Sequence, residues 1–314
     1  MHPALSVIVF TVATGAGYGL LALTGIAFAL GAVPVGTGFA ATTLGLAFAL
    51  TTGGLLASTA HLGHPERAWR AFTQVRSSWL SREGVASLAT YVPFAAFAGG
   101  WILLGPATPW LPLAGLAGAA LAAVTVWCTA MIYRSLRPVH QWCNPHVVPV
   151  YLALALMSGA LWLDALTRLF GQPHRVIGVV AALAIVLAVV LKERYWRFID
   201  GTKSASSAGS ATGLGRFGEV RLLDPPHTGS SYLLDEMGFR LARKHATRLR
   251  RIALAAGFAL PLALTLLALI APVLGAAAAT LAALSAMAGL LVERWLFFAE
   301  AKHTVTLYYG AATA

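Results

Sequence analysis

The strongest constraint on the fold of this 314-residue chain is a series of uncharged runs that recurs along the whole sequence. Each run is about 20 residues long, and at 1.5 Å per residue such a helix crosses the hydrocarbon core of a bilayer. Charged residues make up 11% of the chain and hydrophobic residues 58%, with a mean hydropathy of +0.75. These values argue against an ordinary soluble domain and predict an all-α integral membrane protein.

Eight runs are long and apolar enough to cross the membrane. Short uncharged turns such as GAVPVGTG, GPATPW and APVLGA join several of them as tight helical hairpins. We therefore expect a bundle of eight transmembrane helices that forms a single domain over residues 1–314. The predicted spans are residues 4–29, 38–60, 84–104, 112–133, 147–168, 175–194, 251–272 and 275–298.

Basic residues are unequally distributed between the two ends of this predicted bundle. Of 22 Lys and Arg residues, Arg168 and Arg175 alone fall at the end that carries the short turns. All the others lie at the opposite end with both termini, and the positive-inside rule places that end in the cytoplasm. Orientation and anionic headgroups account for the net charge of +11, so no nucleic-acid partner is expected.

Ionisable residues are concentrated in one connection, STAHLGHPERAWRAFTQVRSSWLSREG, between the second and third runs. His61 follows the second run and Glu83 immediately precedes the third, so both side chains can lie at one depth. A histidine can hydrogen-bond a quinone carbonyl, and a partly desolvated carboxylate can relay protons from water. We interpret His61 and Glu83 as catalytic residues of a quinone site. The alternative is that they cap helices or pair with neighbouring arginines.

The same connection supplies further candidates for binding. Trp79 and His64 are expected to contribute to the quinone site, although His64, which precedes Pro65, also suits a turn. Nearby arginines could dock an acidic partner surface or bind headgroup phosphates. These are Arg67, Arg70, Arg76 and Arg82.

The sequence predicts neither a metal site nor a haem in this chain. Cys128 and Cys143 form no CxxC or disulfide-rich pattern. None of the nine histidines falls in the middle of a predicted span, where a membrane b-type haem generally takes its axial ligands from facing helices. Electrons handled by this chain would therefore come from a cytoplasmic metal centre in a partner protein and meet quinone near that surface.

The long connection over residues 195–250 is predicted to be a cytoplasmic loop that docks a partner. It begins with a Ser/Gly/Ala-rich stretch and ends with LLDEMGFRLARKHATRLRR, which can form an amphipathic basic helix on anionic lipid or on a partner. Arg216 and Arg221, in the middle of this connection, are assigned to the partner-docking surface.

Several motifs resemble those of the membrane anchor subunit of dimethyl sulfoxide reductase-type molybdoenzymes. They are HPALSVIVFT, STAHLGHPERAWRAF, SSWLSREG, RPVHQWCNP and ERWLFFAEAKHTVTLYY, and the similarity extends over nearly the whole chain. The stretch GLGRFGEVRLLDPPHTG is most similar to the branch that anchors cytoplasmic sulfite dehydrogenase, a sulfite:quinone oxidoreductase.

This resemblance implies a haem-free anchor with eight helices in the bacterial inner membrane. It also implies two partners, an iron–sulfur (ferredoxin-like) subunit and a catalytic subunit with molybdopterin guanine dinucleotide. The quinone-site histidine of the family matches His61, and its essential acidic residue matches Glu83.

We therefore expect a subunit that passes electrons from the iron–sulfur partner to ubiquinone or menaquinone. Quinol oxidation that feeds a sulfoxide-type reductase stays open, because the potentials of the partners set the direction. An anion transporter is the alternative from another class. Transporters commonly place broken helices and polar groups at the midplane, where these runs carry few charges.

Overall fold

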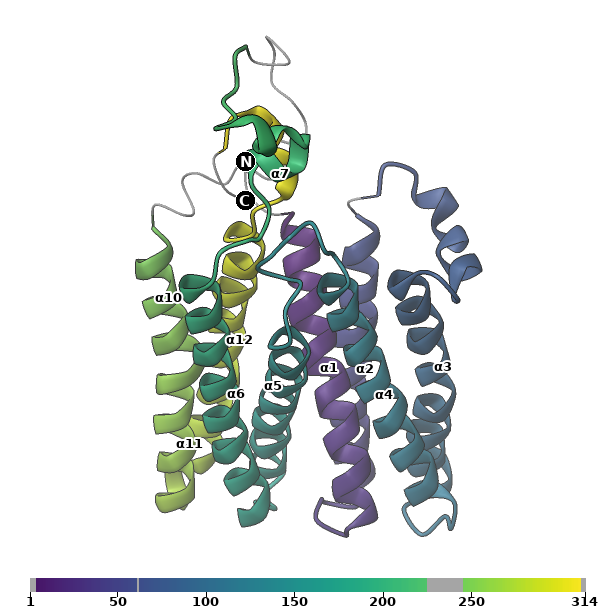
Figure 1. The fold of residues 1–314 in the computed structure, drawn as a ribbon. Coiled ribbons are helices and arrows are strands. Elements are labelled where there is room, and N and C mark those ends of the chain that lie inside the picture. Colours follow the sequence, from purple (N-terminus) through teal and green to yellow (C-terminus); the bar gives the residue numbers. More distant parts are fainter. Residues whose placement is uncertain (1–3, 61, 225–244, 312–314) are drawn as a thin grey trace.

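The computed structural model of the chain describes residues 4–60, 62–224 and 245–311. In these residues it is a bundle of long helices, with no strand (Figure 1). Eight helical segments are long and apolar enough to cross a membrane, as predicted from the sequence. They are α1 (Leu5–Ala29), α2 (Thr37–Thr59), α3 with its π-helical end η2 (Trp79–Leu104), α4 (Leu111–Arg134), α5 (Val147–Leu169), α6 (Arg175–Gly201), a composite helix (Ala246–Ile270), and η5 with α12 (Pro272–Ala299).

The centre of the bundle is formed by α1 and α5. The first of these packs against α2, α4, α5 and α12, and α5 also contacts α4, α6 and α12. Their apolar windows are 67% and 78% buried, more than those of the other six spans, so these two helices are enclosed by protein rather than lipid. Figure 1 shows α3 at one edge of the bundle and the composite helix at the other.

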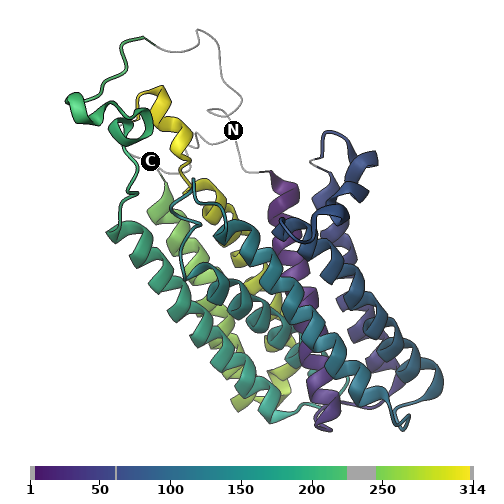
Figure 2. The same ribbon diagram turned by 45° about the vertical axis from the view of Figure 1, so that its right-hand side comes forward.

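The two ends of the bundle differ. At the hairpin end, short connections join α1 to α2, η2 to α4, α5 to α6, and the composite helix to α12 (Figure 2). The basic end carries the beginning of α1, the end of α12 and the longer connections. These contain the short helices η1 (Pro65–Gln74), α7 (Ala208–Thr212), η3 (Leu214–Phe217) and η6 (Thr304–Tyr309). The Tyr308 hydroxyl donates to the Ala211 carbonyl at 2.9 Å, so η6 packs on the long connection.

Three helices extend beyond their predicted bounds at the basic end. Helix α3 begins at Trp79 rather than residue 84, because Ser78 caps it by accepting a hydrogen bond from the Ser81 N–H. Two helices reach into the predicted loop over 195–250: α6 ends at Gly201, and the composite helix begins at Ala246. Most of the predicted amphipathic basic helix lies outside the described residues.

The composite helix contains a π-helical turn. It consists of α10 (Ala246–Leu254), the π turn η4 (Ala255–Ala259) and α11 (Leu260–Ile270). Pro261 lacks the N–H that an α-helix uses at that position, and π turns are one way in which a helix absorbs such a break. Ser285 of α12 donates to the Ala256 carbonyl at 2.7 Å, which satisfies an acceptor within the π turn.

Small residues allow close approach in the centre of the bundle. A Cβ added to Gly19 of α1 would lie 1.9 Å from the Ala155 carbonyl oxygen of α5, so the backbones pack there without side chains between them. A Cβ added to Gly15, one turn earlier, would meet only the Ala155 Cβ, at 4.0 Å. This face of α1 is therefore tightly packed at Gly19 and open at Gly15.

Candidate functional site

Glu83 is a buried carboxylate in the first turns of α3. Its residue exposure is 5%, and the Thr129 hydroxyl of α4 donates to its Oε1 at 2.5 Å. The expectation that Glu83 precedes the helix is wrong, since α3 begins at Trp79 and carries this side chain into the α3/α4 interface.

The buried carboxylates among the described residues differ in the partner that each one contacts. Asp164, Glu293 and Glu300 each form an ion pair with an arginine or lysine. Among the described residues, Glu83 forms no ion pair, and its carboxylate is held by the neutral hydroxyl of Thr129. A carboxylate without a bound cation can gain and lose a proton without breaking an ion pair.

The other predicted quinone-site residues lie around the same helix ends or outside the described residues. His61 is among the latter, so its closeness to Glu83 stays a prediction. His64 is exposed, with its Nδ1 3.0 Å from Glu66 Oε1, and does not contribute to the buried surroundings of Glu83. Trp79 begins α3 and packs edge to face on Trp127 of α4, with ring centroids 5.1 Å apart.

The four arginines assigned to docking at this end have two structural roles. Arg67, Arg70 and Arg76 are exposed at the basic end, as a docking surface requires. Arg82 is half-buried and donates to the carbonyls of residues 75 and 76 at 2.9 and 2.8 Å, while its guanidinium lies over the Trp79 ring. The structure therefore uses Arg82 to fix the turn that leads into α3.

The two arginines of the long connection are also exposed. Arg216 lies over the Phe217 ring at 4.6 Å, and Arg221 pairs with Glu219 at 2.9 Å. Their segment packs on η6 rather than on the connection before α3, so the predicted docking residues occupy two separate parts of the basic end.

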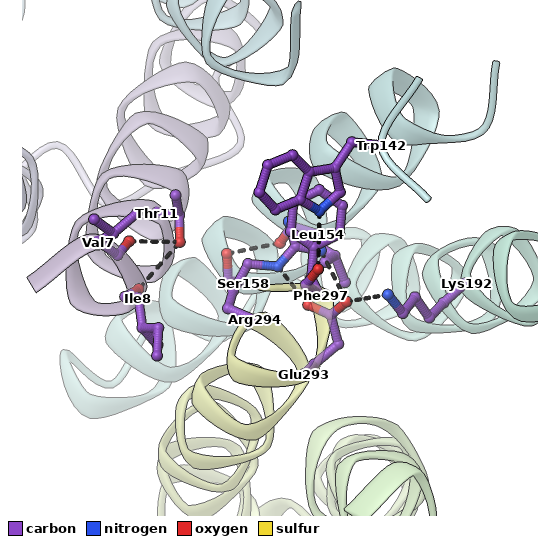
Figure 3. Close-up of polar contacts among 10 residues, drawn as sticks. All are labelled: Val7, Ile8, Thr11, Trp142, Leu154, Ser158, Lys192, Glu293, Arg294 and Phe297. Carbon is purple, nitrogen blue, oxygen red and sulfur yellow. Dashed lines mark hydrogen bonds and ion pairs between the residues drawn. The ribbon is translucent and has the colours of Figure 1, made fainter. Parts of the chain in front are cut away.

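A buried ionic cluster that the sequence analysis did not identify lies deeper in the bundle (Figure 3). Glu293 of α12 pairs with Lys192 of α6 and with its neighbour Arg294, whose Nε lies 2.5 Å from Glu293 Oε2. All three residues are at most 3% exposed. The Lys192 Nζ lies 4.1 Å from the Tyr195 ring centroid, and the Arg294 guanidinium 4.3 Å from that of Tyr151. Aromatic faces thus replace part of the water around both cations.

A second charged cluster connects this region with the surface of the basic end. Arg250 of α10 pairs with Asp200 of α6 at 2.6 Å and with Glu300, which follows α12, at 2.7 Å. The Asp200 side chain is 57% exposed, whereas the Glu300 side chain is 7% exposed. Burial raises the pKa of the Glu300 carboxyl above its ordinary value, although Arg250 opposes this effect.

A cavity of about 30 Å³ lies between α1, α4, α5 and α12. Its accessible wall is mostly apolar, but several polar side chains reach it, and it is named the polar cavity for them. Arg294 and Thr129, the hydrogen-bond donor to Glu83, are both part of its wall. Further hydroxyl groups on the wall come from Thr11, Thr14, Tyr151 and Ser158. Figure 3 shows Thr11, Ser158 and Arg294 side by side between α1, α5 and α12.

An apolar cavity of about 440 Å³ adjoins the polar one. It lies between α1, α4 and α5, and the two cavities share Val126 and Ala155 as wall residues. Tyr18 is its polar lining residue, and the rest of the wall is glycine and aliphatic side chains. Its size and lining suit a hydrocarbon chain.

Comparison with known proteins places the chain in a family. The family described as DMSO reductase anchor subunit (DmsC) matches residues 1–310. The C subunit of the sulfite dehydrogenase of Allochromatium vinosum is 33% identical over 325 aligned positions, which cover 98% of this chain and 99% of the relative. The chain belongs to the DMSO reductase anchor subunit family.

Two further relatives are similar over a shorter region. The C chain of the anaerobic dimethyl sulfoxide reductase of Escherichia coli is 30% identical over 148 residues, which cover 44% of this chain and 49% of the relative. The YnfH chain of an anaerobic dimethyl sulfoxide reductase from the same organism is 28% identical over 148 residues, 44% of this chain and 50% of the relative. The protein is thus a membrane anchor subunit of an oxidoreductase complex, as the sequence motifs indicated.

Proposed function

We propose that this anchor subunit is the quinone-reducing membrane subunit of a sulfite:quinone oxidoreductase. It holds an iron–sulfur subunit and a molybdopterin subunit at the cytoplasmic face of the bacterial inner membrane. The similarity over 98% of the chain to the C subunit of a sulfite dehydrogenase supports the substrate. The count of basic residues supports the orientation, because the basic end carries all but two of the Lys and Arg residues.

The observation that carries the proposal is the state of Glu83. An ionisable residue at membrane depth is costly and is a functional candidate by default. Asp164 and Glu293 are explained by their ion pairs, but Glu83 has a hydroxyl as its partner and lies at the end of the bundle that carries the exposed arginines. This is the arrangement expected of a group that exchanges protons with a bound substrate.

The proposed chemistry assigns one task to each side chain. Quinone reduction takes up two electrons and two protons, and the electrons come from the iron–sulfur centre of the partner. Quinone binds near the basic ends of α2 and α3, where His61 hydrogen-bonds one carbonyl and Glu83 delivers protons. Because protons and electrons both enter from the cytoplasm, turnover moves no net charge across the membrane.

The test uses the complex purified through this subunit from its native membrane. Sulfite-dependent reduction of a short-chain quinone measures the whole reaction, and sulfite-dependent reduction of ferricyanide measures the partner subunits alone. We expect Glu83→Gln and His61→Ala to lose quinone reduction and to keep ferricyanide reduction. Glu66→Gln is the matched control, since it changes an exposed carboxylate of the same connection.

Wild-type quinone reduction in both variants contradicts the site. An assembled complex that is inert to sulfite but oxidises quinol with a sulfoxide contradicts the direction, and it supports the reaction that the names of the Escherichia coli relatives suggest. A subunit that purifies without partners contradicts the anchor role and favours transport.

A further inference from the structure

We propose that the polar cavity holds water and that, with the buried ionic cluster, it forms an internal proton route from the basic surface to Glu83. The route begins at Glu300, passes the Lys192–Glu293–Arg294 cluster, enters the cavity beside Arg294 and ends at Thr129. This inference rests on the proposed function of Glu83, because it names the path that reloads that carboxylate.

The inner end of the route is the cavity itself. Its volume of about 30 Å³ accommodates roughly two waters, at about 10–15 Å³ for each water centre. Thr11, Thr14 and Ser158 already donate to carbonyls of their own helices, so each presents a hydroxyl oxygen that can accept a bond from water. Thr129 lines this cavity and donates to Glu83, so a single hydroxyl separates the cavity from the carboxylate.

The middle of the route is the pair of Lys192 and Glu293. A proton that shifts from the ammonium to the carboxylate leaves both groups neutral, while Arg294 stays charged because its guanidinium does not release its proton. Arg294 contacts Glu293 and also lines the cavity, so one side chain lies between the pair and the water-sized space. Among the described residues, these groups link α6, α12 and the cavity.

The outer end is Glu300. Its Oε1 accepts from Arg250, and its buried Oε2 has no hydrogen-bond partner among the described residues. The Lys192 Nζ and the Arg250 guanidinium both lie over the Trp196 ring, 4.8 and 5.3 Å from its centroid, which places this end of the route beside the Lys192–Glu293 pair. The Glu300 side chain is itself 7% exposed, and Arg250 holds it beside the exposed Asp200, so this end of the route lies near the surface of the described residues.

The route supplies the number of protons that the proposed reaction consumes. Two protons enter at Glu300 for each quinone, and two leave from Glu83 to the two quinone oxygens. Both electrons come from the iron–sulfur centre of the partner. Only N–H and O–H bonds are made and broken in this chain, and each group returns to its initial state.

The experiment fills the cavity without displacing the backbone. Gly15 lies on the cavity wall, and a Cβ there meets only the Ala155 Cβ at 4.0 Å, so Gly15→Val places methyl groups in the space. Gly45→Val is the matched control, because a Cβ at this exposed position of α2 meets nothing within 4 Å. We expect Gly15→Val to slow sulfite-dependent quinone reduction roughly tenfold or more and to increase its solvent isotope effect in D₂O.

A second variant tests the ionic cluster. Glu293→Gln removes the carboxylate that carries the proton, and we expect the same loss of quinone reduction, with partial recovery when formic acid is added as a small proton carrier. Ferricyanide reduction should be unchanged in Gly15→Val and in every assembled variant.

Either of two results overturns the route. If Gly15→Val and Glu293→Gln turn over quinone at the wild-type rate with an unchanged isotope effect while Glu83→Gln is inactive, Glu83 takes protons from elsewhere and the proposed function stands. If both variants lose ferricyanide reduction as well, the cavity and the cluster serve assembly rather than proton transfer. A wild-type rate in Glu83→Gln removes the proposed function itself.

Discussion

The Thr129 hydroxyl lies 2.5 Å from the Glu83 carboxylate, across the interface between α3 and α4. The same interface holds a second polar contact further from the basic end, where the hydroxyls of Thr90 and Thr125 are 3.1 Å apart. Hydroxyl groups thus satisfy the polar atoms between these two helices, and Glu83 is the group among them that can titrate.

Removal of the Thr129 hydroxyl should impair Glu83 at nearly constant side-chain volume. Thr129→Val leaves the carboxylate without its donor, and an unsatisfied buried acceptor costs about 1–3 kcal/mol. We expect a lower melting temperature and slower quinone reduction in Thr129→Val, and neither effect in Thr129→Ser. Thermal unfolding and turnover of the purified complexes measure the two effects. Equal behaviour of the Val and Ser variants contradicts a role for this hydrogen bond.

The contact between α1 and α5 should tolerate no side chain at Gly19. Gly19→Ala places a Cβ 1.9 Å from the Ala155 carbonyl oxygen, and overpacking of this kind costs about 1–3 kcal/mol. We expect a lower melting temperature of the detergent-solubilised protein. Gly15→Ala, one turn away on the same helix, is the control and should leave the melting temperature unchanged. A stable Gly19→Ala variant shows that the helices separate at little cost.

Within the buried ionic cluster, loss of the single carboxylate, Glu293, should destabilise the protein most. Glu293→Leu leaves Lys192 and Arg294 buried together without a counter-ion, and loss of one partner of a buried pair costs about 3–5 kcal/mol. Lys192→Met is expected to cost less, because Glu293 and Arg294 still neutralise each other. Thermal unfolding of both variants checks the order. The reverse order indicates that Lys192 carries most of the stabilisation.

The exposed arginines before α3 should affect how strongly the partners are held. In Arg67→Gln/Arg70→Gln/Arg76→Gln we expect less of the partner subunits to co-purify, with the largest deficit at low salt. Exposed charges act over about 8 Å at physiological ionic strength and are screened further as salt rises. Arg175→Gln removes an exposed charge at the hairpin end and is the control. Full retention of partners in the triple variant contradicts docking through these side chains.

The C-terminal segment should loosen in mild acid. The backbone N–H of Val305 donates to His303 Nδ1 at 3.0 Å, and burial lowers the pKa of His303 below its ordinary 6.5. Because the folded state binds this proton more weakly than the unfolded state, the stabilisation is complete above pH ~6.5 and is lost as the pH falls toward the folded pKa. Hydrogen exchange of η6 should therefore accelerate on acidification.

A control separates the titration of His303 from its capping role. His303→Asn keeps a side-chain acceptor for the Val305 N–H and removes the ionisable group, so the pH dependence of exchange should disappear. If exchange in this variant accelerates in acid as it does in the wild type, another group is responsible.

The eight spans could be predicted from the sequence because lipid demands long apolar helices, and this demand leaves a local signal. The first turns of α3 were missed because residues 79–83 are mostly polar, and the cap provided by Ser78 outweighs their low hydropathy. For that reason Glu83 was expected before the helix. Its role in a quinone site stays a prediction, and its burial against Thr129 depends on how α3 and α4 pack, which no local pattern encodes.

The ionic cluster could not be predicted by the same means. Lys192 and Glu293 each lie near a helix end, where ionisable residues usually reach the headgroups, so their sequence context is typical of an interface. They meet because α6 and α12 are brought together by α5, which contacts both. Gly15 and Gly19 also could not be told apart from the sequence, because their local sequences are similar. In the structure Gly15 lines a cavity, whereas Gly19 contacts the backbone of α5.

The π turn η4 acts as a one-residue insertion in the seventh span. Each residue of an α-helix advances the chain by about 100°, so this extra residue rotates α10 relative to α11. Arg250, on the rotated part, faces Asp200 and Glu300, while Pro261 remains in the register of α11. The deletion of one residue from 255–259 would turn Arg250 away from both carboxylates, so the length of this stretch is constrained even though its side chains are small and apolar.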